Sequence, residues 1–257
     1  MPRYALGIEY DGTDYFGWQR QRQERTLQAT LEKALAFVAN EPVQVICAGR
    51  TDTGVHALGQ VVHFDCAATR SERAFVLGTN SRLPDSLALT WARIVSDQFH
   101  ARYSARLRSY RFRILRRDTR PALEARNALW VREPVELASM ITASRHLIGR
   151  HDFTSFRTIA CQANSPVRQI HRIDIREHGA WIELEFEANA FLHHMIRNIV
   201  GSLLMVGHGE RVPDWIAQVL NGRDRSKAGP TAPPQGLTFL CARYPSEFGL
   251  PPEHSLP

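Results

Sequence analysis

One carboxylate in the 257-residue sequence has neighbours suited to chemistry. Asp52 follows an apolar run at residues 43–47 and precedes a second one at 61–66. Both runs have the composition of β-strands, which predicts that Asp52 lies on the loop between them. Gly49 and Gly54 bracket Asp52 and supply the backbone freedom that a loop needs where it turns tightly or meets another molecule. The sequence therefore places this side chain where a substrate can reach it.

Arg50 stands two residues before Asp52. An opposite charge within hydrogen-bonding reach favours the ionised carboxylate, so Arg50 can keep Asp52 ready as a nucleophile or a base. The alternative is structural, because an aspartate between glycines also stabilises a hairpin through an Asx-turn. Local features alone leave both interpretations open.

The charged composition favours a nucleic-acid partner. The net charge is +6, and of 32 basic residues only Lys33 and Lys227 are lysines, which leaves thirty arginines. Arginine binds phosphate through two parallel hydrogen bonds and stacks on bases. A genome rich in G and C also favours arginine over lysine, so composition alone leaves a second explanation.

Cysteine spacing and hydropathy indicate the compartment. The four cysteines, Cys47, Cys66, Cys161 and Cys241, show no Cys-x-x-Cys spacing, so we expect reduced thiols. The sequence contains no signal peptide and no apolar run of about eighteen residues, the length that spans a membrane. We therefore expect a cytoplasmic protein that does not bind a membrane.

Residues 13–25 have no helical or strand period. They interleave aromatic residues with arginines: Tyr15, Phe16, Trp18, Arg20, Arg22 and Arg25. Exposed aromatics beside cations suit stacking on bases and contact with phosphate. Arg20 and Arg22 are therefore candidate RNA-binding residues, and packing of Phe16 and Trp18 onto the core is the alternative.

A second arginine-rich segment accompanies an expected strand at residues 107–115. Residues 102–120 contain eight arginines, a density that predicts a phosphate-facing surface. Arg108 and Arg111 are the candidate RNA-binding residues there. Three large side chains share one side of this strand: Tyr110, Phe112 and Ile114.

Hydrophobic periodicity predicts two halves with one element order. In the first half we expect β-α-β-β-α-β at residues 4–10, 26–40, 43–47, 61–66, 71–80 and 87–95. In the second half we expect the same order with one extra helix, at residues 107–115, 134–149, 167–175, 181–186, 192–204, 213–220 and 237–244. This is the order of the ferredoxin-like unit, in which helices cover one face of an antiparallel sheet. The prediction is an α+β fold with one extended, mostly antiparallel sheet and a cleft across its open face.

The expected domains follow from this repeat. Residues 1–104 form the half that carries the Asp52 loop, and residues 105–247 form the half that carries Tyr110. Residues 248–257 are expected to be a loose tail.

Other kinds of site find little support. His193 and His194 are adjacent on an expected helix and so face different ways, and no Cys or carboxylate cluster has metal-ligand spacing, so we expect no metal. No Walker loop, dinucleotide fingerprint or nucleophile elbow occurs, so we expect no nucleotide cofactor and no serine hydrolase.

Several motifs, in order along nearly the whole chain, resemble those of the tRNA pseudouridine synthase A family. They are YDGT at 10–13, GWQ at 17–19, GRTDTGVHA at 49–57, YRF at 110–112, HDF at 151–153 with Phe156, and HMIRNIVG at 194–201. The resemblance implies two ferredoxin-like halves, a homodimer, no cofactor or metal, and isomerisation of uridines 38, 39 and 40 in the anticodon arm of tRNAs. Many relatives have a second tyrosine where this chain has Phe112, which puts one hydroxyl contact in doubt.

The resemblance also implies roles. Asp52 resembles the catalytic aspartate, which acts at ribose C1′, at uracil C6 or as a base at the sugar; the sequence leaves these open. Arg197 resembles the basic partner of that aspartate, and Tyr110 the active-site tyrosine that stacks on uracil. Arg50 is a candidate to fill the space left by a flipped-out base, and Leu237 to line the pocket.

Two rival functions use the same basic surface. A non-catalytic RNA-binding protein with two RRM-like units would carry a glycine-aromatic motif that is absent here. A nuclease would need clustered metal-binding carboxylates, which the sequence does not show.

Overall fold

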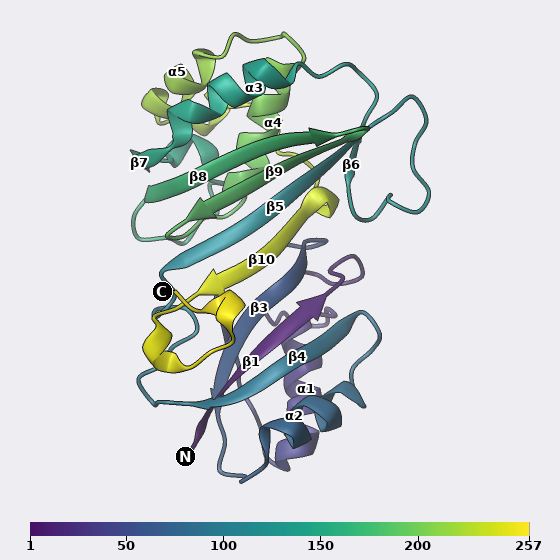
Figure 1. The fold of residues 1–257 in the computed structure, drawn as a ribbon, viewed down its shortest axis with the longest axis vertical. Coiled ribbons are helices and arrows are strands. Elements are labelled where there is room, and N and C mark those ends of the chain that lie inside the picture. Colours follow the sequence, from purple (N-terminus) through teal and green to yellow (C-terminus); the bar gives the residue numbers. More distant parts are fainter. Residues whose placement is uncertain (257) are drawn as a thin grey trace. The chain divides into compact units, whose positions relative to one another are not determined.

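The computed structural model describes residues 1–256 and divides into two compact units. Unit 1 comprises Met1–Arg108 together with the C-terminal segment from Thr238, and unit 2 comprises Ser109–Leu237. Each unit combines an open, mostly antiparallel sheet with helices packed on one of its faces (Figure 1). The structure confirms the predicted α+β class.

The sheet of unit 1 has the strand order β4-β1-β3-β10. Its strands are β1 (Arg3–Tyr10), β3 (His56–Asp65), β4 (Leu87–Val95) and β10 (Leu237–Arg243), and a short β2 (Ile46–Cys47) pairs with β3. β1 is antiparallel to both β3 and β4, whereas β10 runs parallel to β3 through Thr238 opposite His56. A strand from the end of the chain thus extends the sheet that holds the Asp52 loop.

Two helices pack on one face of this sheet. They are α1 (Leu27–Ala39) and α2 (Glu72–Asn80). The Thr26 hydroxyl caps α1 by accepting from the N–H of Ala29, and Asn40 ends it in the left-handed conformation. Phe75 of α2 packs against Tyr4 of β1 in the core, with 4.6 Å between the centres of their rings.

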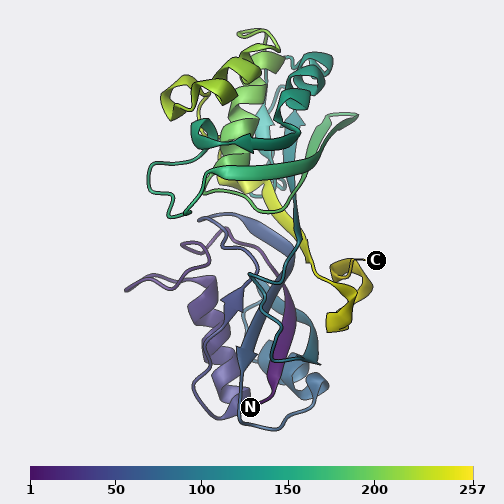
Figure 2. The same cartoon turned by 90° about the vertical axis from the view of Figure 1, so that its left-hand side faces the viewer.

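The other face of the same sheet is also covered. The ring of Phe99, in the segment after β4, lies 5.0 Å from Tyr244 and 5.2 Å from Phe248, and Trp91 packs 5.4 Å from His254. Figure 2 shows the C-terminal segment on the side of the sheet opposite α1. We expected a free face here, and the apolar side chains of Phe99 and Trp91 explain why it is not free.

Unit 2 has a sheet with the order β5-β9-β8-β7. Its strands are β5 (Leu107–Arg116), β7 (Gly149–Asp152), β8 (Val167–His178) and β9 (Trp181–Ala188), and β6 (Leu129–Val131) pairs in parallel with β5. Its helices are α3 (Leu137–Ser144), α4 (Met195–Gly207) and α5 (Trp215–Gly222). Short 3-10 helices occur at Arg145–Leu147, Thr154–Phe156, Arg225–Lys227, Pro234–Gly236, Ser246–Phe248 and Pro252–His254.

These boundaries differ from the expected ones at two places. The chain divides into its two units between Arg108 and Ser109 rather than near residue 104. Residues 248–256 are folded rather than loose, because Tyr244 exchanges backbone hydrogen bonds with His254 and Leu256. None of the helices formed by residues 1–256 is long and apolar enough to cross a membrane.

Candidate active site

The Asp52 loop connects β2 to β3, as its flanking runs predict. Asp52 is half-buried and Arg50 is exposed, whereas Thr51 and Val55 on the same loop are buried. The loop turns at Gly54, whose φ of 76° is in the left-handed region, and the N–H of Val55 donates to the carbonyl of Asp52 at 3.2 Å. The backbone thus holds the turn and leaves the Arg50 side chain outside.

Two buried side chains fix the first part of the loop. Nε2 of Gln60, a residue of β3, donates to the carbonyl of Gly49 at 2.6 Å and to the hydroxyl of Tyr10 at 3.4 Å. The N–H of Gly49 donates back to Oε1 of Gln60 at 3.3 Å. The Tyr10 hydroxyl shares a 2.8 Å hydrogen bond with the hydroxyl of Thr51. β1 and β3 therefore hold the residues on both sides of Arg50.

The segment after β1 supports the loop from the other direction. The N–H of Trp18 donates to the carbonyl of Thr51 at 3.0 Å. A Cβ on Gly17, whose φ is +77°, would lie 2.9 Å from that carbonyl oxygen, and a Cβ on Gly12 would lie 2.0 Å from the carbonyl oxygen of Val55. Glycine is required at both positions because two stretches of backbone touch there.

His56 follows the loop and faces the same segment. Its Nδ1 accepts from the N–H of Gly12 at 3.2 Å and lies 3.1 Å from Oδ1 of Asp11. His56 therefore ties the first residue of β3 to the segment that follows β1.

Arg108 has a different place from the one we expected. Its side chain is buried, and its Nε and Nη2 both donate to the carbonyl of Ala48, at 3.2 and 3.1 Å. Nη1 donates to the carbonyl of Ala105 at 3.3 Å, and Nη2 also donates to that of Arg102. The buried guanidinium thus fixes the start of the Asp52 loop through backbone carbonyls.

The aromatic loop at residues 13–25 is likewise more buried than its composition suggested. Tyr15 and Trp18 are 1% and 2% exposed, and only Phe16 among its aromatics is exposed. Arg20 forms an ion pair with the buried carboxylate of Glu32. Arg22 remains exposed.

Unit 2 carries the other candidate residues. Tyr110, on β5, is buried and its ring meets Phe191 edge-on at 5.1 Å. Arg197, on the first turn of α4, is half-buried, and its Nε donates to the carbonyl of Ala232 at 2.7 Å. Leu237 is buried at the start of β10.

Comparison with known proteins decides the family. Residues 7–104 and 143–245 match the family model described as tRNA pseudouridine synthase. The chain belongs to the tRNA pseudouridine synthase family. It is 52% identical over 255 residues to the tRNA pseudouridine synthase A of Stenotrophomonas maltophilia (strain R551-3), covering 99% of this chain and 100% of the relative. It is 51% identical over 249 residues to the one of Shewanella amazonensis (strain ATCC BAA-1098 / SB2B), covering 97% of this chain and 95% of the relative. Pseudouridine synthases are isomerases.

The buried side chain of Asn198, to which the sequence analysis gave no role, supports Arg197 in this synthase. Asn198 Oδ1 accepts from the hydroxyl of Thr231 at 2.7 Å and from Nη2 of Arg225 at 3.1 Å, and its Nδ2 donates to the carbonyl of Phe156 at 2.8 Å. These bonds hold the 225–232 segment, which supplies the carbonyl that binds Arg197. The sequence carries one signal of this role, because an asparagine among the apolar residues of a helix must find hydrogen-bond partners when it is buried.

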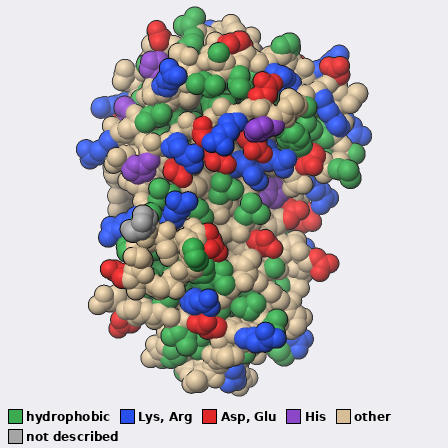
Figure 3. Space-filling view, in the orientation of Figure 1, with side chains coloured by type: hydrophobic (Ala, Val, Ile, Leu, Met, Phe, Trp, Pro, Cys, Tyr) green, Lys and Arg blue, Asp and Glu red, His purple; other side chains and the backbone are tan. Residues whose placement is uncertain are grey.

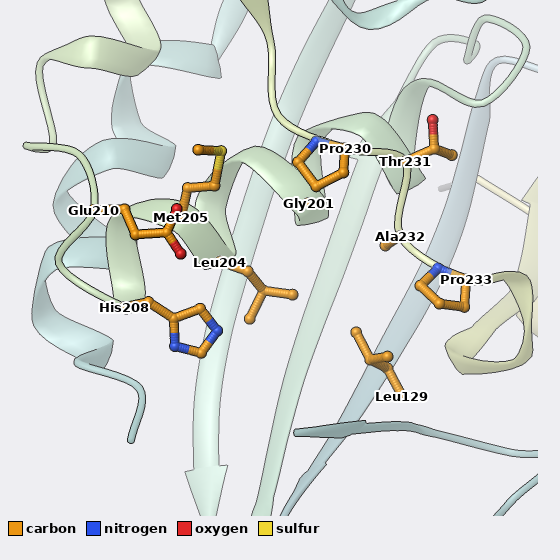
Figure 4. A pocket seen from close by; sticks show the side chains of 10 residues that line it. All are labelled: Leu129, Gly201, Leu204, Met205, His208, Glu210, Pro230, Thr231, Ala232 and Pro233. Carbon is orange, nitrogen blue, oxygen red and sulfur yellow. The ribbon is translucent and has the colours of Figure 1, made fainter. Parts of the chain in front are cut away.

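The same segment borders a pocket of 410 Å³ on α4 (Figure 4). Its wall is mostly apolar and consists of Leu129, Gly201, Leu204, Met205, His208, Glu210, Pro230, Thr231, Ala232 and Pro233. Figure 4 shows His208 and Glu210 at one end and Pro233 and Leu129 at the other.

Arginines on the exposed face of the unit 2 sheet are paired within the synthase. Arg172 lies 3.2 Å from Glu187 and 3.1 Å from Asp174, and Arg113 lies 3.3 Å from Glu183. Figure 3 shows blue and red side chains interleaved over this region. Arginine density here reflects a cross-strand charge ladder as well as any affinity for phosphate. Arg111, the last candidate, is half-buried.

His193 and His194 also differ from expectation. They precede α4 rather than lying on it, because His194 adopts a φ of 62°. Their rings stand 4.2 Å apart, so the two side chains do face one way.

Proposed function

We propose that this chain converts uridine to pseudouridine in tRNA with Asp52 as the catalytic carboxylate. The observation that carries the proposal is the Asp52 loop of a family member. Buried hydrogen bonds from Gln60 and Arg108 hold the backbone just before Asp52, yet Asp52 itself is only half-buried. A catalytic group needs this combination of fixed backbone and open side chain.

The isomerisation breaks the bond between ribose C1′ and uracil N1 and forms one between C1′ and C5. The C5 proton leaves, N1 gains a proton, and no oxidant or reductant is needed. Asp52 acts either by attacking C1′ or C6, which gives a covalent intermediate, or by removing a sugar proton. Each route begins at an ionised carboxylate.

The remaining roles in the proposal follow the family pattern. Tyr110 stacks on the uracil, Arg197 pairs with the catalytic carboxylate, Arg50 fills the space of the flipped base and Leu237 lines the pocket. The target uridines are 38, 39 and 40 of the anticodon arm, and the enzyme acts as a homodimer in the cytoplasm.

The deciding experiment follows tritium release from unmodified tRNA labelled at uracil C5. The parent protein should release tritium, and Asp52→Ala should release none while its Kd for tRNA stays within twofold. Asp85→Ala, which removes an exposed aspartate of the same unit, is the matched control and should keep full activity. Release by the Asp52→Ala variant would refute the role of Asp52. Binding by the parent without release would favour a non-catalytic RNA-binding protein, and cleaved tRNA would favour a nuclease.

A further inference from the structure

An exposed tyrosine lies on the turn that follows β4. Tyr103 is 72% exposed, more than any other Phe, Tyr or Trp among residues 1–256. The guanidinium carbon of Arg102, also exposed, lies 5.6 Å from the centre of its ring. An aromatic face beside an exposed cation is a combination that proteins use to stack on single bases.

The Tyr103 ring rests on a column of rings anchored in the core. The ring of His100 lies 4.3 Å from that of Tyr103, with 31° between their planes, and 4.6 Å from that of His63. His63 is 3% exposed. One side of the tyrosine is thereby supported, although most of its surface remains in solvent.

Hydrogen bonds make the turn rigid. Nδ1 of His100 accepts from the N–H groups of Arg102 and Tyr103, both at 3.1 Å, and the N–H of His100 donates to the hydroxyl of Ser104 at 3.0 Å. Nδ1 of His63 accepts from the N–H of Ala101 at 3.1 Å. Burial lowers the pKa of both histidines and so favours their neutral form, in which Nδ1 can accept these hydrogen bonds. A ring ordered in advance loses little entropy when a ligand stacks on it.

The turn is tied to the start of the Asp52 loop. Nη2 of Arg108 donates to the carbonyls of both Arg102 and Ala48, so one buried nitrogen joins the two segments. The exposed tyrosine therefore belongs to the same unit as the candidate catalytic loop and is braced against the loop's first residue.

We propose that Tyr103 and Arg102 form a stacking site for a nucleobase of the tRNA substrate, outside the pocket of the reacting uridine. The proposal rests on the proposed function, which supplies the RNA. The base stacks on the free part of the tyrosine ring while Arg102 binds a neighbouring phosphate. The polar neighbourhood, with Arg106 also exposed, suits a polyanion better than an apolar protein surface.

The test measures the Kd for unmodified tRNA, with kcat and KM from tritium release. Because stacking on an aromatic side chain is worth about 1–3 kcal/mol per base, Tyr103→Ala should raise Kd and KM by about 5- to 150-fold and leave kcat within twofold. Tyr103→Phe and Tyr103→Trp should bind as the parent does, because they keep a ring. Tyr103→Leu should bind as poorly as Tyr103→Ala.

Phe37→Ala provides a matched control. Phe37 is 60% exposed and has the guanidinium of Arg82 3.7 Å from its ring centre, but it lies on helix α1. Loss of this ring should leave Kd unchanged. Equal Kd values for the parent, Tyr103→Ala and Phe37→Ala would overturn the stacking site, and so would full binding by Tyr103→Leu.

The salt dependence of Kd distinguishes the contribution of base stacking from that of phosphate contacts. Arg102→Ala should reduce the slope of log Kd against log salt by about 0.7–0.9, as expected for one lost phosphate contact, whereas Tyr103→Ala should leave the slope unchanged. Failure of the proposed function would appear as absent tritium release by the parent. Failure of the stacking site would appear as unchanged binding by Tyr103→Ala in an active enzyme.

Discussion

The side-chain amide of Gln60 binds both backbone groups of Gly49, donating to its carbonyl at 2.6 Å and accepting from its N–H at 3.3 Å. Gln60 is fully buried and belongs to β3, so a strand of the core sets the position of a loop that leads to Asp52. A buried amide that satisfies two backbone groups rigidifies the segment it binds.

Replacing Gln60 by leucine should therefore reduce kcat more than binding. Gln60→Leu leaves both groups of Gly49 without these partners, which costs about 1–3 kcal/mol of unfolding free energy. A loop displaced by about 1 Å can cost about 10²-fold in rate, so we expect kcat to fall 10- to 100-fold while Kd for tRNA stays within twofold. Gln44→Leu, on an exposed residue of the same unit, is the control. An unchanged kcat in a folded Gln60→Leu variant would show that Gln60 does not position the Asp52 loop for catalysis.

Arg108 and Arg22 should respond to mutation in opposite ways. Arg108 is buried on backbone carbonyls, whereas Arg22 is exposed. Arg108→Met should lower the unfolding free energy by about 1–3 kcal/mol, because buried carbonyls lose their donor, and should keep the salt dependence of tRNA binding. Arg22→Ala should keep the melting temperature and reduce the salt slope of tRNA binding by about 0.7–0.9, because one phosphate contact is lost. Thermal melts and binding at several salt concentrations check both. A reduced salt slope in Arg108→Met would show that its guanidinium reaches RNA after all.

The place of Arg108 could have been predicted from the sequence. Arg108 lies on the same face of β5 as Tyr110, Phe112 and Ile114, at every second position, and all four residues are buried. A period of two assigns residues of equal parity to one face, so the apolar partners already indicated an inward arginine. The high density of charge in the segment obscured this signal.

Other features could not be predicted in the same way. The flanking strand patterns locate the Asp52 loop, but a strand's period does not reveal its partner, so the parallel pairing of β10 with β3 needed coordinates. Residues 13–25 have no period, and the burial of Tyr15 and Trp18 depends on contacts with distant backbone, such as the bond from Trp18 to Thr51. Tertiary packing determines the conformation and burial of such segments.

The free energy of unfolding should decrease as the pH is lowered, over a pH range that the pKa of His63 determines. Burial, with His100 and Arg3 nearby, lowers the pKa of His63 to about 4, while Asp65 opposes the shift. The unfolded chain binds the proton near pH 6.5 and the folded chain only near pH 4, so the stabilisation is present above pH 6.5 and is lost as the pH falls toward 4. Each unit of pKa difference corresponds to about 1.4 kcal/mol.

His63→Gln tests this window because an amide keeps an acceptor for the N–H of Ala101 but does not titrate. Urea unfolding from pH 7 to 4.5 should show a smaller loss for His63→Gln than for the parent. Burial lowers the pKa of His100 and of His254 as well, so some acid sensitivity should remain. Parallel profiles for the two proteins would exclude His63 as a source of the sensitivity.

Gly201 should be intolerant of alanine although it lies within a helix. A Cβ there would stand 1.8 Å from the carbonyl oxygen of Pro230, so the 230–232 segment must move. That segment holds Arg197 through the carbonyl of Ala232. Alanine ordinarily stabilises a helix by about 1 kcal/mol relative to glycine, and here the clash should reverse the sign to a loss of about 1–3 kcal/mol.

Gly222→Ala is the matched control for this substitution. Its Cβ would meet only the flexible Lys227 side chain, at 3.2 Å, so helix α5 should tolerate the change. Thermal melts and tritium release should show lower stability and activity for Gly201→Ala and neither loss for Gly222→Ala. If Gly201→Ala kept its activity despite lower stability, the 230–232 segment would not be what positions Arg197, since the clash displaces that segment directly.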